Sequence, residues 1–344
     1  MNRKETNQEN FIDKRILDTL MINMGYRQGE DVLIVSQEWH PSLGSETRTE
    51  FESSQKLARR MFDVLSGFCN VRFVEYVPTK AQHGVDVRQE VYEQAGKPDI
   101  IFIPTAFSLT HTPFRMHLTN LEARVATMPT FKLEMFEEGG PMDIDYKKVG
   151  EDTKKVAEDL RRSKYVKITG KGTDVNVEID ARNVHVSSGM LTQKGAYGNL
   201  PGAEAYVTPR HLGNSNGYFT VPKGWGGPFP LKHRARFYIK QGRFVEVSGE
   251  TLETQKWIDG KVKPSILREN GAEEGFDVLA ELGIGTNPNV TQEYIMKHGW
   301  NNLLAEKIIR SVHLANGNSK SFGGQNDVRI HQDWVVPDVT IEYL

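Results

Sequence analysis

The chain has 344 residues, of which 38% are hydrophobic and 26% charged, and its formal net charge is −2. These values are typical of a globular protein long enough for two domains. The near-neutral net charge gives no sign of the positive surface that binds nucleic acid or an anionic membrane. No run of about 18 apolar residues occurs, and the N-terminus is too polar for a signal peptide. The single cysteine, Cys69, excludes an internal disulfide, so we expect a cytoplasmic protein.

Helical and strand patterns alternate in the first half of the chain. Apolar residues recur at helical spacing over residues 10–24, 51–65 and 85–95. Short apolar strands are expected at residues 31–35, 70–76 and 99–103. This alternation predicts an α/β domain with a mostly parallel sheet and crossover helices. A charged helix over residues 145–162 follows, and we place the boundary of the N-terminal domain (residues 1–163) at its end.

Three polar residues, Thr110, His111 and Thr112, come shortly after the third predicted strand. Ligands in open α/β sheets often bind outside the carboxyl ends of the strands, so these residues could contact a substrate. Alternatively, Thr112 caps the helix that Pro113 begins, and His111 lies in a surface turn. The sequence favours the capping interpretation.

The second half, residues 164–344, has the pattern of a β-rich (α+β) domain. Residues 165–180 alternate around a Gly-Lys-Gly-Thr turn, which predicts a hairpin. Further short strands follow, and helical patterns return only near residues 271–280 and 291–297. We expect a curved antiparallel sheet or partial barrel. The glycines of GWGGPFP (residues 224–230) do not match a phosphate-binding spacing.

Two histidines and an aspartate lie near the C-terminus in segments of strand character. Residues two apart in a strand share a face, so His331 and Asp333 of VRIHQDWVV should point the same way. His313 lies in SVHLANG, which the Gly323–Gly324 turn could bring alongside. An imidazole beside a carboxylate is a pair of metal ligands that needs partners. A buried histidine with a surface aspartate explains an isolated pair more simply.

Three glutamates interrupt apolar or glycine-rich contexts: Glu204 in NLPGAEAYV, Glu281 in VLAELGIGTNP and Glu306 in LLAEKIIRSVHLANG. A buried carboxylate is normally paired, hydrogen-bonded or bound to a cation. A capping or surface role would explain each acid alone. Together with the two histidines and Asp333, however, the set suits two divalent ions that share a bridging carboxylate and a water.

The chain resembles the metallo-aminopeptidases of the aminopeptidase T type along most of its length. The shared segments are THT with ARVATMP, then ITGKGTDVNV, NLPGAEAYV, LAELGIGTNP, EKIIRSVHLANG and IHQD. The last four coincide with the family's metal-binding segments. The resemblance implies a homodimer that removes N-terminal residues from peptides with two zinc, cobalt or manganese ions. The ligands it implies are Glu204, Glu281, His313, His331 and Asp333.

The chain departs from that family at Lys320, where a tyrosine is usual. A protonated lysine is no metal ligand but could hold a substrate carboxylate or an oxyanion. The chain is also similar to a branch of the superfamily that resembles 2,5-dihydroxypyridine 5,6-dioxygenase. That similarity implies one ferrous ion on His313, His331 and Asp333. Glu281 stands where that branch would be expected to have a histidine.

Three functional hypotheses therefore remain open. The main one is a metal-dependent, aminopeptidase-like hydrolase that uses a metal-activated water, with Glu306 moving the proton and Lys320 stabilising negative charge. The alternative is an Fe(II)-dependent ring-opening dioxygenase. The third is a binding protein that kept the fold without the chemistry. We expect a small-molecule or short-peptide substrate and no nucleic-acid or membrane partner.

Overall fold

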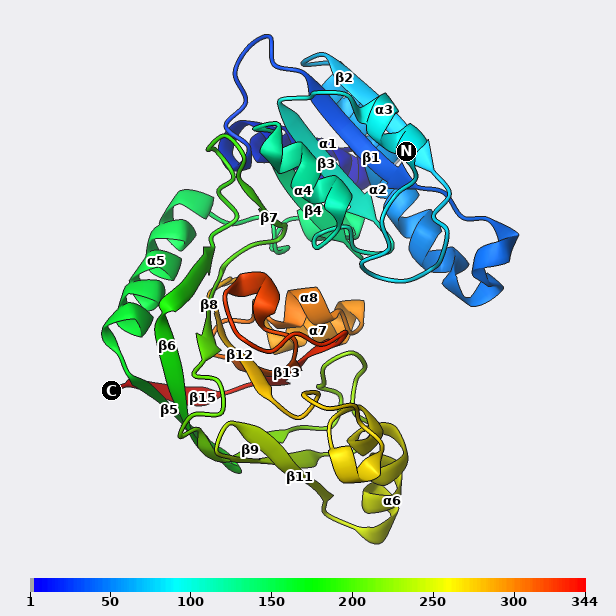
Figure 1. Cartoon of the computed structure of the whole chain (residues 1–344). Helices are drawn as coiled ribbons and strands as arrows, with labels where there is room; N and C mark the ends of the chain where they lie inside the picture. The colour runs from blue at the N-terminus through cyan, green and yellow to red at the C-terminus, as the bar shows by residue number, and fades with distance from the viewer. Residues whose placement is uncertain (1–2) are drawn as a thin grey trace. The chain divides into compact units, whose positions relative to one another are not determined.

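The computed structural model describes residues 3–344, which form two compact units (Figure 1). The first unit holds the chain up to residue 150 together with residues 189–202, and the second holds residues 151–188 and 203–344. This division differs from the boundary expected after residue 163 in two respects. Most of the preceding helix belongs to the second unit, and a later segment returns to the first unit as a strand.

A five-stranded parallel sheet forms the centre of the first unit, with the order β2-β1-β3-β4-β7. Its strands are β1 (Val32–Gln37), β2 (Val71–Tyr76), β3 (Ile100–Thr105), β4 (Arg124–Pro129) and β7 (Tyr197–Asn199). Every pairing is parallel, as the alternation of elements predicted. β1, β3 and β4 are buried at every position, because helices cover the sheet.

The helices of the first unit are α1 (Arg3–Asp18), α2 (Arg48–Ser66), α3 (Gln89–Ala95) and α4 (Pro113–Asn120). A π-helical turn, η1 (Thr19–Asn23), follows α1 directly, and the 3-10 turns are η2 (Pro41–Leu43), η3 (Ser45–Thr47) and η4 (Leu133–Phe136). One face of the sheet packs on α3 and α4 in a single apolar cluster that includes Leu33, Ile101, Val91 and Phe114. Apolar periodicity predicted α3, β1, β2 and β3 of this core, whereas β4 was not predicted and α4 was expected only from its capping threonine.

The polar segment after β3 forms the start of α4. Thr112 is the N-cap residue: it is fully buried, and its hydroxyl accepts a hydrogen bond from the backbone N–H of Arg115. The Thr110 hydroxyl oxygen lies 3.0 Å from Thr127 Oγ1 and 3.0 Å from Asn199 Oδ1, within hydrogen-bond distance of both in the same unit. The structure confirms the capping interpretation of this segment.

The second unit is a ten-stranded antiparallel sheet in which β11, β10, β9, β6, β8, β12, β13 and β14 follow one another, and β5 pairs with β6 and β15. Its strands are β5 (Tyr165–Gly170), β6 (Thr173–Ser187), β8 (Glu204–Pro209), β9 (Asn216–Val221), β10 (Ala235–Lys240), β11 (Arg243–Gly249), β12 (Leu279–Gly285), β13 (Val312–Gly317), β14 (His331–Val336) and β15 (Val339–Tyr343). The predicted hairpin is β5–β6, which turns at Gly172 with a φ of +76°.

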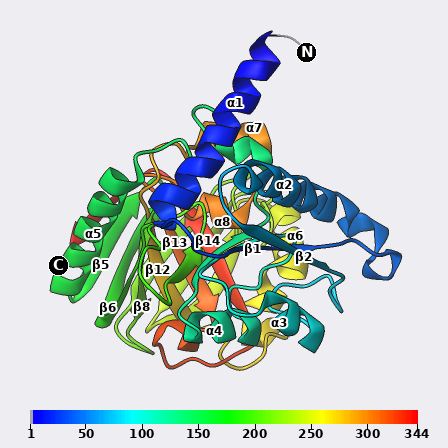
Figure 2. The ribbon, with the colours of Figure 1, turned by 90° about the horizontal axis from the view of Figure 1, so that it is seen from above.

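The helices of the second unit are α5 (Tyr146–Arg162), α6 (Leu252–Lys261), α7 (Gln292–His298) and α8 (Asn302–Ala305), with 3-10 turns η5 (Lys263–Ser265), η6 (Arg268–Asn270) and η7 (Lys320–Phe322). α5 lies beside β5 and β6 in both views (Figures 1 and 2), and Arg161 donates to the carbonyl of Val184 in β6. Among the described residues, no helix is both long and apolar enough to cross a membrane.

The helix expected over residues 271–280 is absent from that segment of the described chain. Gly271 and Gly275 have φ values of +100° and +86°, which break any helical run. The segment instead forms turns and then enters β12 at Leu279. The helix expected over residues 291–297 is present as α7.

Candidate metal centre

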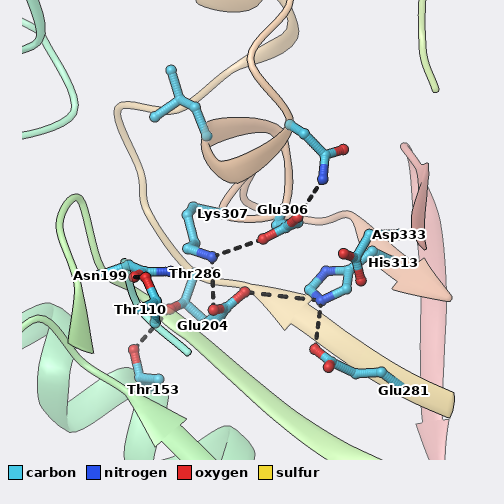
Figure 3. Close-up of polar contacts among 12 residues, drawn as sticks. Thr110, Thr153, Asn199, Glu204, Glu281, Thr286, Glu306, Lys307, His313 and Asp333 are labelled. Carbon is cyan, nitrogen blue, oxygen red and sulfur yellow. Dashed lines mark hydrogen bonds and ion pairs between the residues drawn. The ribbon is translucent and has the colours of Figure 1, made fainter. Parts of the chain in front are cut away.

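Four neighbouring strands of the second unit carry Glu204, Glu281 and Asp333 and both histidines singled out as metal ligands, whereas Glu306 lies at the end of α8. β8, β12, β13 and β14 lie side by side in that order. Glu204 begins β8, Glu281 lies in β12, His313 in β13, and His331 and Asp333 in β14. Residues far apart in the chain are thus brought to one region of the sheet (Figure 3).

Small residues lie directly across the strands from each of these side chains. Gly285 faces Glu204, Gly283 faces His313, and Gly317 faces His331. Ala315 lies between Glu281 and Asp333 in one cross-strand row. Opposed side chains in a sheet are close neighbours, so a small partner leaves room for a large polar group to lean over the next strand.

His331 and Asp333 point to the same side of β14, as expected from their spacing. His331 Nε2 lies 3.2 Å from Asp333 Oδ1, and Nδ1 lies 2.7 Å from the carbonyl oxygen of Asn318. With Nδ1–H donating to that carbonyl, Nε2 is the nitrogen available to a metal. On the opposite side of the strand, the buried Trp334 donates to Asn316 Oδ1 at 2.8 Å and anchors β14.

Glu281 places its carboxylate between the two imidazoles. Its Oε1 lies 3.1 Å from His313 Nε2, and its Oε2 lies 3.4 Å from His331 Nε2. One ligand atom each from Glu281, His331 and Asp333 fall within 4.8 Å of one another. Imidazole nitrogens and carboxylate oxygens at this separation are suited to a divalent transition metal.

A buried lysine that sequence reasoning missed completes the cluster. Lys307 is fully buried, and its Nζ lies 2.7 Å from Glu204 Oε1 and 3.2 Å from Glu306 Oε2. Glu306 Oε1 accepts a hydrogen bond from Asn302 Nδ2 at 2.7 Å. In the sequence, Lys307 follows Glu306 in the mostly apolar run LLAEKII, and those apolar neighbours were the only signal of its burial, since lysine is mostly exposed.

Lys320 lies on η7, where it forms an ion pair with Asp327 and its side chain is 65% exposed. A catalytic role for Lys320 or Glu306 stays a prediction. The neighbouring Phe322 packs edge-on against the ring of His331, with centroids 5.5 Å apart, and also contacts His185 and Tyr206. An aromatic group thus lies beside the histidine of β14.

Electrostatics favour an ionised cluster. Burial alone would raise the pKa of Glu281, but hydrogen bonds from His313 and His331 outweigh it and lower that pKa. Burial likewise opposes the charged form of Asp333, whose pKa nevertheless falls well below its usual range beside His331. Burial would lower the pKa of His313, but the hydrogen bond to Glu281 and the nearby carboxylates raise this pKa to about 9. Burial also opposes the charged form of His331, but the charge of Asp333 raises the pKa of His331 well above its ordinary value.

These observations fit a bound cation. Glu204 Oε2 is buried, accepts no hydrogen bond from the residues that the structure describes, and lies 3.9 Å from His313 Nε2. His313 Nδ1 is likewise buried without a hydrogen-bond partner in the described chain. Buried polar atoms are normally satisfied, so the buried Glu204 oxygen beside the imidazoles fits a missing cation, whereas His313 Nδ1 calls only for a hydrogen-bond partner.

We expect metal binding to release protons. The pKa of His313 is raised to about 9 and that of His331 above its usual value, so a divalent ion that binds through either Nε2 competes with a proton there. The affinity should therefore rise with pH below the raised pKa values, by about tenfold per unit for each proton released. Calorimetric titration with Mn(II) in buffers of different ionisation enthalpy measures the number of protons released. A heat of binding that does not depend on the buffer would contradict proton release.

Comparisons with known proteins add family information to this geometry. A family model described as NicX, 2,5-dihydroxypyridine 5,6-dioxygenase, matches residues 19–343. The solved structure of 2,5-dihydroxypyridine dioxygenase from Pseudomonas putida KT2440 is similar with a TM-score of 0.71 at 11% identity, covering 98% of this chain and 93% of that chain. Wild-type AmpT from Thermus thermophilus gives a TM-score of 0.60 at 14% identity, covering 98% and 95%. No curated protein sequence matches the chain. At these identities the two structural similarities show a shared two-domain fold.

Proposed function

Because the chain belongs to the 2,5-dihydroxypyridine 5,6-dioxygenase family, we propose that it is a metal-dependent dioxygenase that opens a hydroxylated nitrogen-containing aromatic ring. The observation that carries this proposal is the family match over residues 19–343. The cluster of Glu281, His331 and Asp333, with ligand atoms within 4.8 Å of one another, independently supports the metal dependence.

The family match corrects the main functional hypothesis drawn from the sequence. An aminopeptidase-like hydrolase with a two-metal-activated water was expected, and the dioxygenase was the alternative. The family that matches the chain is the dioxygenase family, so the hydrolytic expectation is wrong. The similarity to AmpT, at 14% identity, shows a shared fold and does not extend to the reaction.

We assign a single ferrous ion to His331, Asp333 and Glu281, with His313 at the same carboxylate. These three ligands are one imidazole and two carboxylates, and His313, whose Nε2 lies 3.1 Å from Glu281 Oε1, brings the second imidazole that a non-haem iron site uses. When bound, ferrous iron supplies the electron transfer that allows dioxygen to react with an electron-rich ring. The hydrogen bond from His331 Nδ1 to the Asn318 carbonyl orients the ring so that Nε2, near Asp333 and Glu281, would be the atom that holds the ion.

Other residues of the chain would bind and orient the substrate. Glu204 Oε2 is free of hydrogen bonds from the described residues and can accept the proton of a ring hydroxyl, while Oε1 stays paired with Lys307. Phe322 and Tyr206, packed together with centroids 5.8 Å apart, offer an apolar surface for a flat ring beside His331. Glu281 and Asp333 are buried, whereas the His331 side chain is 29% exposed, which leaves that side open to a ligand.

Oxygen consumption tests this proposal. The protein, loaded anaerobically with Fe(II), is mixed with 2,5-dihydroxypyridine in aerated buffer, and both dioxygen and the ring absorbance are followed. We expect about one dioxygen consumed per ring lost, and no consumption with 2-hydroxypyridine, which lacks the second hydroxyl. Protein that retains its iron but consumes no dioxygen with any dihydroxylated pyridine or benzene would overturn the proposal.

A further inference from the structure

Lys307 has an unusual position for a lysine. Its side chain is wholly buried beside the candidate metal centre, and it forms ion pairs with two carboxylates, Glu204 at 2.7 Å and Glu306 at 3.2 Å (Figure 3). Removing an ammonium group from water is expensive unless opposite charges surround it closely. Glu204 is the stronger partner, because burial raises the pKa of Glu306 to about 8 and the charge of Lys307 only partly offsets that rise.

The backbone holds Lys307 in this position. The carbonyl of Lys307 accepts a hydrogen bond from the N–H of Asn287 at 3.0 Å, just beyond β12. Gly285 permits the close approach, since a Cβ at that position would lie 2.6 Å from the carbonyl carbon of Lys307 and 2.2 Å from the oxygen of Ile308. The ammonium is therefore directed at the acidic cluster by a rigid strand contact rather than by a flexible surface loop.

We propose that the ammonium of Lys307 takes the place of a second metal ion, so that this cluster admits one divalent cation and no more. The inference rests on the proposed metal centre and specifies its stoichiometry from this chain's own residues. Glu204 Oε1 is already occupied by Lys307, and the ligand group within 4.8 Å consists of Glu281, His331 and Asp333 without Glu204. A second divalent ion near Glu204 would face the fixed positive charge of Lys307 at short range.

The same geometry predicts what happens when the charge is removed. In Lys307→Met, Glu204 and Glu306 lose their shared counter-ion but keep positions that held one cation between them. Carboxylate oxygens converging on a buried site are suitable ligands for Mn(II). A second Mn(II) should therefore bind where the ammonium was, displacing any proton held by Glu306.

The test is the number of Mn(II) ions bound per chain, measured without dioxygen by equilibrium dialysis and elemental analysis. We expect about one ion for the wild type and for Lys307→Arg, and about two for Lys307→Met. Lys307→Met combined with Glu204→Gln is the matched control, because it removes the charge together with the main ligand of the second site; it should bind about one.

Restoration of thermal stability by Mn(II) is a second readout, and the loss of a purely structural lysine would not produce it. Without metal, Lys307→Met should melt roughly 10 °C below the wild type, because it leaves buried carboxylates uncompensated. Excess Mn(II) should restore most of that difference in Lys307→Met and much less of it in the variant that also carries Glu204→Gln. Should Lys307→Met give no soluble protein, Lys307→Gln, whose amide can still donate to both carboxylates, is measured in the same way.

The outcomes separate this inference from the proposed function. A wild type that binds two ions, or a Lys307→Met or Lys307→Gln variant that binds only one, would overturn the role of Lys307 while leaving a metal centre in place. A wild type that binds no ion would overturn the metal centre itself and the inference with it. One ion in the wild type and two in the charge-removing variants would support both.

Discussion

Replacing His331 by alanine is expected to remove both metal retention and dioxygen consumption. His331 is the residue whose two ring nitrogens connect the cluster: Nδ1 faces the Asn318 carbonyl at 2.7 Å, and Nε2 faces Asp333 at 3.2 Å and Glu281 at 3.4 Å. Loss of an outer partner of a metal ligand already lowers affinity by about 10- to 100-fold. Loss of the ligand itself should lower it by more than about 100-fold, and turnover should fall at least as far.

The matched control for this variant is His298→Ala. His298 lies on α7 and stacks on Tyr294 with ring centroids 4.3 Å apart, and the sequence assigns it no ligand role. Metal content by elemental analysis and the initial rate of dioxygen uptake should both stay near the wild-type values in this control. A His331→Ala protein that keeps a full complement of iron would contradict the assignment of β14 as the metal-binding strand.

Replacing Gly283 by alanine is the second variant for which we expect a large effect. Gly283 lies opposite His313 in the β12–β13 pairing, and a Cβ there would lie 2.0 Å from both Cε1 and Nε2 of the imidazole. Either the ring turns away from Glu281 or the two strands move apart. Overpacking of a buried site costs about 1–3 kcal/mol, and we expect a loss of that size in the free energy of unfolding.

Metal affinity should fall in the same variant, because a displaced His313 no longer holds Glu281 at 3.1 Å. Urea unfolding and Mn(II) titration measure the two effects. Gly260→Ala is the control, since nothing lies within 4 Å of a Cβ at this position in α6; it should be neutral or stabilising by about 0.5–1 kcal/mol. The double variant Gly283→Ala with His313→Ala should regain stability without regaining metal affinity. Wild-type stability and affinity in Gly283→Ala would show that the close approach is not essential.

Sequence patterns predicted those elements whose own apolar residues determine their secondary structure. The buried runs of β1 and β3 and the apolar stripe of α2 predicted a parallel sheet, which the structure contains. The same patterns were wrong over residues 271–280, where two glycines with positive φ override a weak helical periodicity. Nothing local indicated that residues 197–199 would return to the first sheet as β7, because a three-residue strand is defined only by its partner.

The candidate site was partly predictable for a similar reason. The spacing of His331 and Asp333 determines their common face within a strand, so this pair could be read directly. Glu204 and Glu281 stood out as acids in apolar or glycine-rich contexts, but their assignment as ligands depended on family resemblance, since their meeting with His313 requires three separate strands to pair in the right register. Lys307 could not be found this way, because its burial depends on Glu204, which lies far away in the sequence and whose position only the folded sheet determines.

The return of residues 189–202 to the first unit affects how the protein can be divided and how it is made. β7 covers the outer edge of β4 at Val125, Ala126 and Thr127. A fragment that ends at residue 150 would leave this edge as an open row of amide and carbonyl groups on an otherwise buried apolar strand, which is a template for self-association. During synthesis, the same edge of β4 stays unpaired until the β5–β6 hairpin and residues 189–202 have left the ribosome. We expect the nascent chain to need a chaperone most during this interval.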